Sequence, residues 1–372
     1  MHHDLIRQSL LSALLFFSFT TLIHAEPDEK KTPSPPPVHT TKTEKPNIII
    51  LATGGTIAGS ADSEVDLVYK PSTLGVQQLI DAVPQVQERA NVTGEQVMQI
   101  ASQNITDDDW IALANRTNEL LKQDDVDGIV ITHGTDTMEE TAYFLNLVSE
   151  SDKPIVLTGA LRPATSLSAD GPINLYNAVS AAANPTLNNF GTVIVMDDYV
   201  LGARDVLKMD IHRTDSFRAP NQGPIGHILY GEYNPVITPL KRHTTNSEFR
   251  ITPETKLPRV AIIPAYSNMS GDLIDAAVNL GYKGIVINGV GDGNMSNAGL
   301  DAVKRAREKG VIVVRASRIP AGLVTRNNEI NDDEYDLVVA DNLSAQKARI
   351  LLKLALLQTQ DTKELQRIFH EY

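Results

Sequence analysis

Two threonine-bearing glycine turns, each following an apolar run, hold the residues of this chain best suited to chemistry. The first turn, Thr-Gly-Gly-Thr, ends at Thr56, and the second, His-Gly-Thr-Asp, contains Thr135 and Asp136. Because the carboxyl ends of the strands border the ligand crevice in a parallel α/β sheet, both turns are expected to face one pocket. Their hydroxyls, backbone N–H groups and carboxylate suit attack on a carbonyl carbon and stabilisation of the resulting oxyanion.

The spacing of the first turn limits its other functions. Its last glycine, Gly59, is followed by serine and alanine rather than by the Lys-Ser/Thr pair of a phosphate-binding loop, and its glycines do not have the G-x-G-x-x-G spacing of a dinucleotide site. A plain strand-to-helix turn, in which glycine supplies a positive φ and threonine caps a helix, stays open for either turn alone. The occurrence of two matched turns favours a site.

The elements that position these turns are predicted by an alternation of apolar β-branched runs and helical patterns. The expected strands are 47–51, 128–131, 154–157 and 192–195 in a first series and 260–263, 284–287 and 311–314 in a second. The expected helices are 137–147, 172–183, 273–280, 298–309, 344–358 and 362–372. This order predicts an α/β protein with two parallel-sheet domains, a larger N-terminal catalytic one (46–235) and a smaller C-terminal one (259–372), and an active site between them. A polar, proline-bearing stretch, 236–258, is the predicted linker.

The N-terminal residues have the pattern of an export signal. Residues 1–25 combine Arg7, a largely apolar run and a small residue, Ala25, where a signal peptide is cleaved. An uncleaved anchor is the alternative, although the apolar run is short for a membrane span. Residues 26–45 are rich in Pro, Thr, Lys and Glu and are predicted to be a disordered leader, or else a ligand for a proline-binding groove. The expected location is therefore the periplasm, with no stable membrane association after cleavage.

Composition excludes several classes of site. The net charge of −13 disfavours a nucleic acid or an anionic membrane as partner. The absence of cysteine excludes a thiol nucleophile and a thiolate metal site, and the nine histidines contain no H-E-x-x-H pattern. We therefore expect no metal site, and we expect His133 of the second turn to form structural hydrogen bonds.

Eight segments of the chain resemble the bacterial type II L-asparaginases and glutaminase-asparaginases. They are 52–59, 92–97, 102–103, 133–141, 159–163, 168–179, 204–208 and 346–349. The likeness extends from Pro46 to Tyr372. It implies an exported amidohydrolase that converts L-asparagine to L-aspartate and ammonia through a covalent acyl-threonine intermediate. It also implies that no cofactor is needed and that the protein is a homotetramer with sites shared between subunits. Some relatives have a disulfide in the first domain, which this chain cannot form.

The resemblance also assigns catalytic roles. It makes Thr56 the nucleophile and places Tyr69, in an expected lid over 62–71, next to its hydroxyl. It groups Thr135, Asp136 and Lys208 opposite the substrate amide. A lysine acts as a base only when deprotonated, which burial favours and a neighbouring aspartate opposes, so the sequence leaves both states of Lys208 open.

The remaining assignments concern substrate binding. Backbone N–H groups near Gly55 and Thr135 are expected to hold the oxyanion. In the family, Ser102, Gln103 and Asp136 correspond to residues that bind the α-amino and α-carboxylate groups. Asn294 and Glu329 correspond to residues that come from the neighbouring subunit, and the glutamate there reaches the substrate ammonium and the lid tyrosine.

One departure from the family pattern concerns substrate choice. Relatives strict for asparagine often have tyrosine where this chain has Ser296. The smaller residue leaves room for a longer substrate, so secondary L-glutaminase activity is expected. Two rival functions stay open: an amidase for glutaminyl or peptidyl amides, and a periplasmic small-molecule-binding protein without catalysis. A binding protein, however, has no need of two hydroxyls aligned with a Lys-Asp pair.

Overall fold

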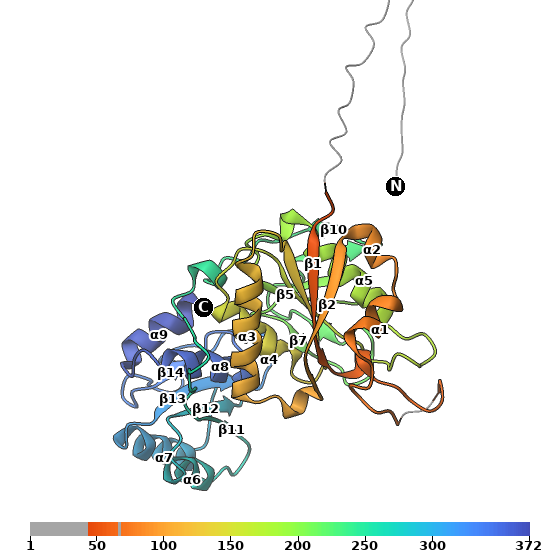
Figure 1. Cartoon of the computed structure of the whole chain (residues 1–372). Coiled ribbons are helices and arrows are strands. Elements are labelled where there is room, and N and C mark those ends of the chain that lie inside the picture. The colour runs from red at the N-terminus through yellow and green to blue at the C-terminus, as the bar shows by residue number, and fades with distance from the viewer. Residues whose placement is uncertain (1–43, 66–67) are drawn as a thin grey trace, which may run out of the picture. The chain divides into compact units, whose positions relative to one another are not determined.

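Two sheets organise the part of the chain that the structure, a computed structural model, describes: residues 44–65 and 68–372 (Figure 1). The predicted signal peptide and residues 26–43 of the predicted leader lie outside the described residues. The predicted class, two α/β domains of unequal size, is confirmed. None of the described helices is both long enough and apolar enough to cross a bilayer.

The larger sheet has eight strands in the order β10-β9-β6-β5-β4-β3-β1-β2. Their bounds are β1 Asn47–Gly54, β2 Asn91–Ile100, β3 Gly128–Thr132, β4 Ile155–Thr158, β5 Thr192–Met196, β6 Tyr199–Gly202, β9 Gly226–Leu229 and β10 Glu232–Pro235. Strands β1, β3, β4 and β5 are parallel, as expected, and β2, which was not expected, pairs parallel to β1; β6, β9 and β10 are antiparallel. The reason is local. Two-residue turns with positive φ at both positions, Asp197-Asp198 and Tyr230-Gly231, join β5 to β6 and β9 to β10, and such turns produce hairpins.

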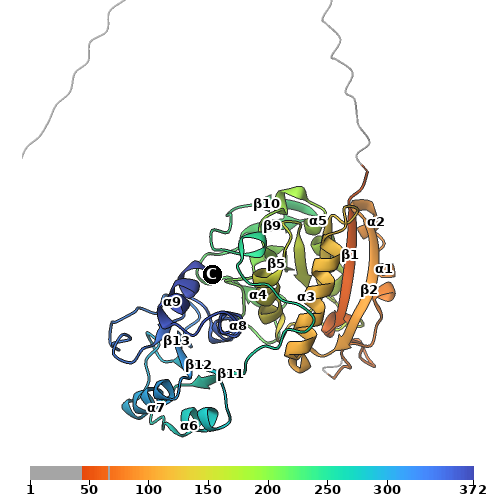
Figure 2. The same ribbon diagram turned by 60° about the vertical axis from the view of Figure 1, so that its left-hand side comes forward.

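Helices cover both faces of this sheet (Figures 1 and 2). One face carries α3 (Asp107–Leu121) and α4 (Met138–Val148), and the other carries α1 (Val76–Asp81), α2 (Val86–Arg89) and α5 (Gly171–Ala182). Strand β3 illustrates the arrangement, because Ile129 and Ile131 pack with α3 and α4 while Val130 packs with α5. Burial on both faces is why the strand sequences are continuously apolar rather than alternating.

The smaller sheet has four parallel strands in the order β11-β12-β13-β14. They are β11 Val260–Pro264, β12 Gly284–Gly289, β13 Ile312–Ser317 and β14 Val338–Val339, and the helices of this region are α6 Asp272–Asn279, α7 Asn297–Glu308, α8 Ala345–Ala355 and α9 Thr362–Glu371. Helices α6 and α7 pack on one face, and α8 packs on the other face and against α4. The hydrophobic cores of the two sheets are therefore continuous through α8. Residues 236–258 contain no strand or α-helix.

Candidate active site

The two glycine turns meet at the carboxyl ends of adjacent parallel strands. The parallel strands have the order β2-β1-β3-β4-β5, so the chain reverses its winding direction between β1 and β3, where α/β sheets bind ligands. The turns touch through their backbones, because a Cβ on Gly55 would lie 2.4 Å from the Cα of Gly134. A Cβ on Gly134 would lie 2.7 Å from Ser102 Oγ. Glycine is thus required at both positions for the turns to share one crevice.

A cavity of about 660 Å³ opens beside these turns. Eight of the predicted site residues line it: Gly55, Thr56, Tyr69, Ser102, Gln103, Thr135, Asp136 and Lys208. Every lining residue lies between positions 55 and 212, so within one chain the larger domain alone forms this cavity.

The Thr56 hydroxyl is held where a nucleophile would be needed. Thr56 is buried, and its Oγ1 lies 2.8 Å from the phenolic oxygen of Tyr69. Gly54 and Gly55 have φ of +113° and +84°, which turns the chain sharply between β1 and Thr56. Tyr69 lies in a loop whose ends are joined by two backbone hydrogen bonds between Ser60 and Lys70. This loop contains the predicted lid, of which residues 66–67 lie outside the described part.

Lys208 joins the other two polar groups of the second turn. Its Nζ donates to Thr135 Oγ1 at 2.9 Å and to Asp136 Oδ1 at 2.8 Å. The Lys208 side chain is 16% exposed, whereas that of Asp136 is 60% exposed, and both residues line the cavity. Lys208 therefore orients the Thr135 hydroxyl and compensates the aspartate charge at once.

Glu139, which the sequence analysis did not single out, fixes the backbone at Lys208. Its Oε2 accepts a hydrogen bond from the Lys208 N–H at 2.6 Å. Burial raises the pKa of the Glu139 carboxyl, against the opposing effect of the positive charges of Lys347 and Lys208. The only signal in the sequence was its place three residues after Asp136, within the second motif.

Lys347 of α8 holds the same segment from behind. It is fully buried, and its Nζ donates to the carbonyl oxygens of Arg204, at 3.1 Å, and of Val206. Burial lowers the pKa of Lys347 to about 8. The C-terminal segment 346–349 thus supports the site through the strand that carries Lys208 (β7, Leu207–Lys208).

One backbone N–H of the first turn already has a partner within the chain. The N–H of Gly55 donates to Ser72 Oγ at 2.8 Å and so is not free to hold a substrate oxygen. The N–H of Thr135 has no hydrogen-bond partner among the described residues, and Thr135 lines the cavity. Thr135 is therefore the better donor of the two.

His133 is buried in a hydrogen-bond chain and does not line the cavity. Its Nδ1 lies 2.7 Å from the carbonyl oxygen of Gly134, and its Nε2 lies 2.9 Å from Thr141 Oγ1, which accepts a hydrogen bond from the indole N–H of Trp110. A carbonyl only accepts, so Nδ1 carries the proton and Nε2 accepts from Thr141. The neutral imidazole of His133 therefore holds the Gly134 carbonyl, next to Thr135, in place.

We expect the burial of His133 to make the protein less stable as the pH is lowered. Burial lowers the pKa of His133 from 6.5 to about 4, so the unfolded chain binds a proton first as the pH falls. Its contribution to the free energy of unfolding is full above pH 6.5 and is lost between 6.5 and about 4, which amounts to about 3 kcal/mol. Urea unfolding at pH 7 and at pH 4.5, at one protein concentration, should show a smaller loss in His133→Gln than in the wild type. An equal loss in both would contradict this role.

The two predicted residues of the smaller domain lie apart from the cavity. Asn294 follows β12 and Glu329 follows β13, and the Asn294 amide donates to Glu329 Oε2 at 2.8 Å. Neither residue lines the cavity of its own chain. Ser296 has a structural role that the sequence did not suggest: its Oγ accepts from Gly299 N–H at 3.1 Å, which caps α7, and donates to the Met269 carbonyl at 2.6 Å. Among the described residues, no group of His, Asp and Glu side chains could hold a metal ion.

Comparisons with known proteins agree with this fold. Residues 47–239 match the family model "Asparaginase, N-terminal", and residues 259–369 match "Glutaminase/Asparaginase C-terminal domain". The chain is 48% identical over 327 residues to a Haemophilus influenzae protein named as a probable periplasmic L-asparaginase, which covers 88% of this chain and 93% of the relative. It is 47% identical, with the same coverage, to L-asparaginase 2 of Escherichia coli. It is 48% identical over 334 residues to a glutaminase-asparaginase of Pseudomonas fluorescens, covering 89% of this chain and 92% of the relative.

The two α/β domains and the threonine site thus belong to a hydrolase. The chain is a member of the asparaginase family, in the group that contains the L-asparaginases and the glutaminase-asparaginases.

Proposed function

We propose that this protein hydrolyses the side-chain amide of L-asparagine through a covalent acyl-threonine intermediate. The observation that carries the proposal is the convergence of Thr56 Oγ1, held by Tyr69, and the Lys208–Thr135–Asp136 group on one cavity. Thr56 Oγ1 bonds to the amide carbon while the Thr135 N–H stabilises the oxyanion. The C–N bond then breaks, and the nitrogen leaves as ammonia with the proton that the Thr56 hydroxyl gave up. Water adds to the acyl group, and the products are L-aspartate and free Thr56.

Substrate binding follows from the polar groups around that cavity. In this proposal Ser102 and Gln103 bind the α-carboxylate, and Asp136 binds the α-ammonium. Asn294 and Glu329 of a neighbouring subunit complete the site, which is consistent with their absence from the lining of their own chain's cavity. The site is therefore shared in a homo-oligomer, which we propose to be a tetramer.

Secondary activity on L-glutamine is part of the proposal. One methylene separates the two substrates and is worth about 1–3 kcal/mol of discrimination in a pocket. Relatives of similar identity include both L-asparaginases and glutaminase-asparaginases.

We further propose export to the periplasm, which the name of the Haemophilus influenzae relative supports. The domain limits 46–235 and 259–372, joined by 236–258, are supported by the two family matches.

A side-by-side assay of the two amides tests this function. Purified protein should release ammonia from L-asparagine, and kcat/KM for L-glutamine should be measurable and lower. Binding of L-asparagine without release of ammonia would decide for a binding protein. Activity restricted to glutaminyl or peptidyl amides would decide for another amidase. The substrate preference is measured on the wild-type chain rather than on a Ser296→Tyr variant. Tyrosine at that position would also remove the side-chain cap of α7.

Glu329→Gln should raise KM for asparagine more than it lowers kcat, because the Glu329 carboxylate is proposed to bind the substrate ammonium in both the ground and the transition state.

Mixed oligomers of Glu329→Gln chains with Thr56→Ala chains test the shared site. Each mixed pair has one site with wild-type Thr56 from one chain and wild-type Glu329 from the other. An equal mixture should thus recover about a quarter of the wild-type sites if pairing is random. Shared sites are ruled out if mixed oligomers form without any recovery of activity.

A further inference from the structure

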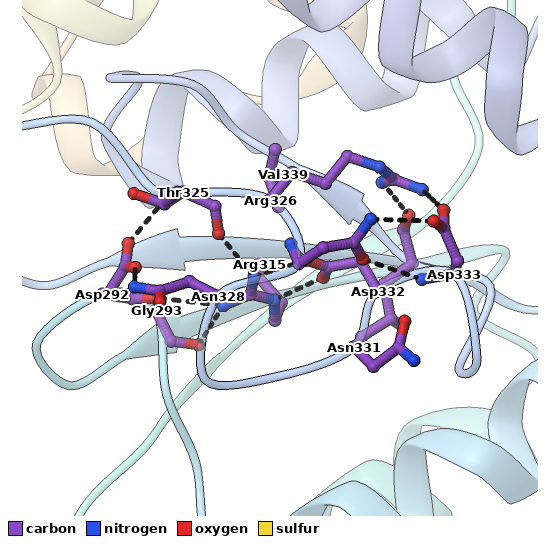
Figure 3. A network of polar contacts seen from close by, with 12 residues as sticks. Asp292, Gly293, Arg315, Thr325, Arg326, Asn328, Asn331, Asp332, Asp333 and Val339 are labelled. Atoms are coloured by element: carbon purple, nitrogen blue, oxygen red, sulfur yellow. Dashed lines mark hydrogen bonds and ion pairs between the residues drawn. The ribbon is translucent and has the colours of Figure 1, made fainter.

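An arginine and an aspartate are buried together beneath the loops of the smaller domain (Figure 3). Arg315 of β13 is 1% exposed and Asp332 is 0% exposed. The guanidinium contacts the carboxylate through both oxygens, with Nε 2.6 Å from Oδ1 and Nη2 2.7 Å from Oδ2. This is the parallel two-bond geometry that arginine, and not lysine, forms with a carboxylate.

The remaining donors of Arg315 bind two separate loops. Nη1 donates to the carbonyl of Asp292 at 2.9 Å, and Nη2 donates to the carbonyl of Thr325 at 3.1 Å. On the other side of the pair, Asp332 Oδ2 accepts from the N–H of Asn327 at 2.8 Å. One ion pair therefore fixes the backbones of residues 290–294 and 325–329.

The side chain of Asp292 joins the same two loops a second time. Its Oδ1 accepts from the N–H of Thr325 at 2.7 Å, and its Oδ2 accepts from the amide of Asn328 at 3.0 Å. The loop is pressed closely on the guanidinium, since a Cβ on Gly293, where φ is +73°, would lie 3.2 Å from Arg315 Nη1.

These loops carry the two residues assigned to the neighbouring subunit's site. Asn294 ends the first loop and Glu329 ends the second, and their side chains are hydrogen-bonded at 2.8 Å. Glu329 is exposed, so its position depends on the loop that carries it. We propose that Arg315, together with Asp332, is a positioning residue that holds Asn294 and Glu329 in the arrangement that binds the α-groups of the substrate in the neighbouring subunit. This inference rests on the proposed function.

Stabilisation alone does not account for this placement. Desolvation of two charges offsets much of their attraction, so a buried ion pair is an inefficient way to stabilise a core. Among the described residues, every hydrogen bond of Arg315 beyond those to Asp332 goes to a carbonyl in residues 290–294 or 325–329. The pair connects the two loops rather than two elements of the core.

Arg315→Lys tests the role of the guanidinium. Lysine keeps the charge but cannot bind Asp332 and both loops at once. We expect KM for asparagine to rise by about 10- to 100-fold, the scale of a misplacement of about 1 Å, with a smaller change in kcat. Arg305→Lys is the matched control: Arg305 pairs with Asp275 in the same domain, at 2.6 Å, and contacts neither loop. Its KM should stay at the wild-type value. An unchanged KM in Arg315→Lys would overturn the proposal.

Mixed oligomers separate positioning in the neighbour's site from a general structural effect. Arg315→Lys chains mixed with Thr56→Ala chains should recover activity, because one site then takes wild-type Thr56 from one chain and wild-type Arg315 and Glu329 from the other. Arg315→Lys chains mixed with Glu329→Gln chains should not recover activity, because each site then receives either the Arg315→Lys or the Glu329→Gln change from the neighbouring chain. The reverse pattern would show that Arg315 acts on the cavity of its own chain and would overturn the proposal.

Two further arms keep the result decisive. If Arg315→Lys does not fold, Asp292→Ala replaces it in both mixtures with the same expected outcomes, because it removes only the side-chain bonds between the loops. The mixture of Thr56→Ala with Glu329→Gln runs in parallel. Failure of that mixture refutes the shared site itself, whereas its success together with failure of the Arg315→Lys and Thr56→Ala mixture refutes only the role of Arg315.

Discussion

Thr56→Ala should leave a folded protein whose kcat with asparagine is lower by a factor on the order of 10⁶, the loss seen when a catalytic nucleophile is removed. The physical reason is that alanine removes the atom that bonds to the substrate carbon, while the turn around it is formed by Gly54, Gly55 and the β1 strand. Steady-state ammonia release measures the loss, and circular dichroism with thermal unfolding checks the fold. Turnover near the wild-type value would exclude Thr56 as the nucleophile.

A neighbouring threonine provides the matched control. Thr53 lies in the same strand end, but its Oγ1 donates to the Thr132 carbonyl at 2.8 Å and is buried away from the cavity. Thr53→Ala loses one buried hydrogen bond, which costs about 1 kcal/mol of stability, and should keep its turnover. Rapid quenching followed by peptide mass spectrometry should find an acyl group on the peptide containing Thr56 in the wild type and in Thr53→Ala.

The parallel strands other than β2 and β14 could be predicted because they are mostly buried on both faces. Runs such as 128–131 are continuously apolar, and the observed β3, β4, β5, β11 and β12 each lie within two residues of their predicted bounds. The antiparallel strands β6, β9 and β10 were missed because they are four residues long and mix polar with apolar residues. Their Asp-Asp and Tyr-Gly turns are weaker signals than the Asn-Gly or Asp-Gly pairs typical of two-residue hairpins. The parallel edge strand β2 was missed because it contains polar residues and is mostly not buried.

Helix α3 was also missed, although its signal is present in the sequence. Thr106 caps the helix and Asp109 completes a capping box, just before the buried Trp110 and Ile111. A capping box followed by apolar residues at helical spacing predicts a helix start. The start of α3 is therefore encoded locally in the sequence.

The site divides in the same way into local and long-range parts. The turns that carry Thr56 and Thr135 are contiguous motifs at strand ends, so their convergence follows from the order of the parallel strands. The bond from Gly55 N–H to Ser72 and the bonds of Arg315 to two loops depend on tertiary packing that no motif encodes. The sequence accordingly identified groups that can react and did not identify the groups that hold them.

Lys208→Met should lower kcat for asparagine by about 10²- to 10³-fold, the range seen when one positioned hydrogen-bond donor of an active site is removed. The substitution keeps the length and apolar stem of the side chain but removes the Nζ that donates to Thr135 and Asp136. The Asp136 carboxylate then loses its internal cation and remains available to the substrate ammonium. We therefore expect KM to change by less than about tenfold, so that most of the effect lies in kcat.

An exposed lysine with the same contact geometry is the control for this variant. Lys256 Nζ lies 2.8 Å from Asp108 Oδ1, the same distance as in the Lys208–Asp136 pair, but both side chains are about three-quarters exposed and neither lines the cavity. Exposed pairs of this kind contribute little to stability, so Lys256→Met should retain wild-type kcat. A similar fall in both variants would point to a general effect of losing a lysine. A wild-type kcat in Lys208→Met would remove Lys208 from the mechanism and leave Thr135 to be oriented by its backbone alone.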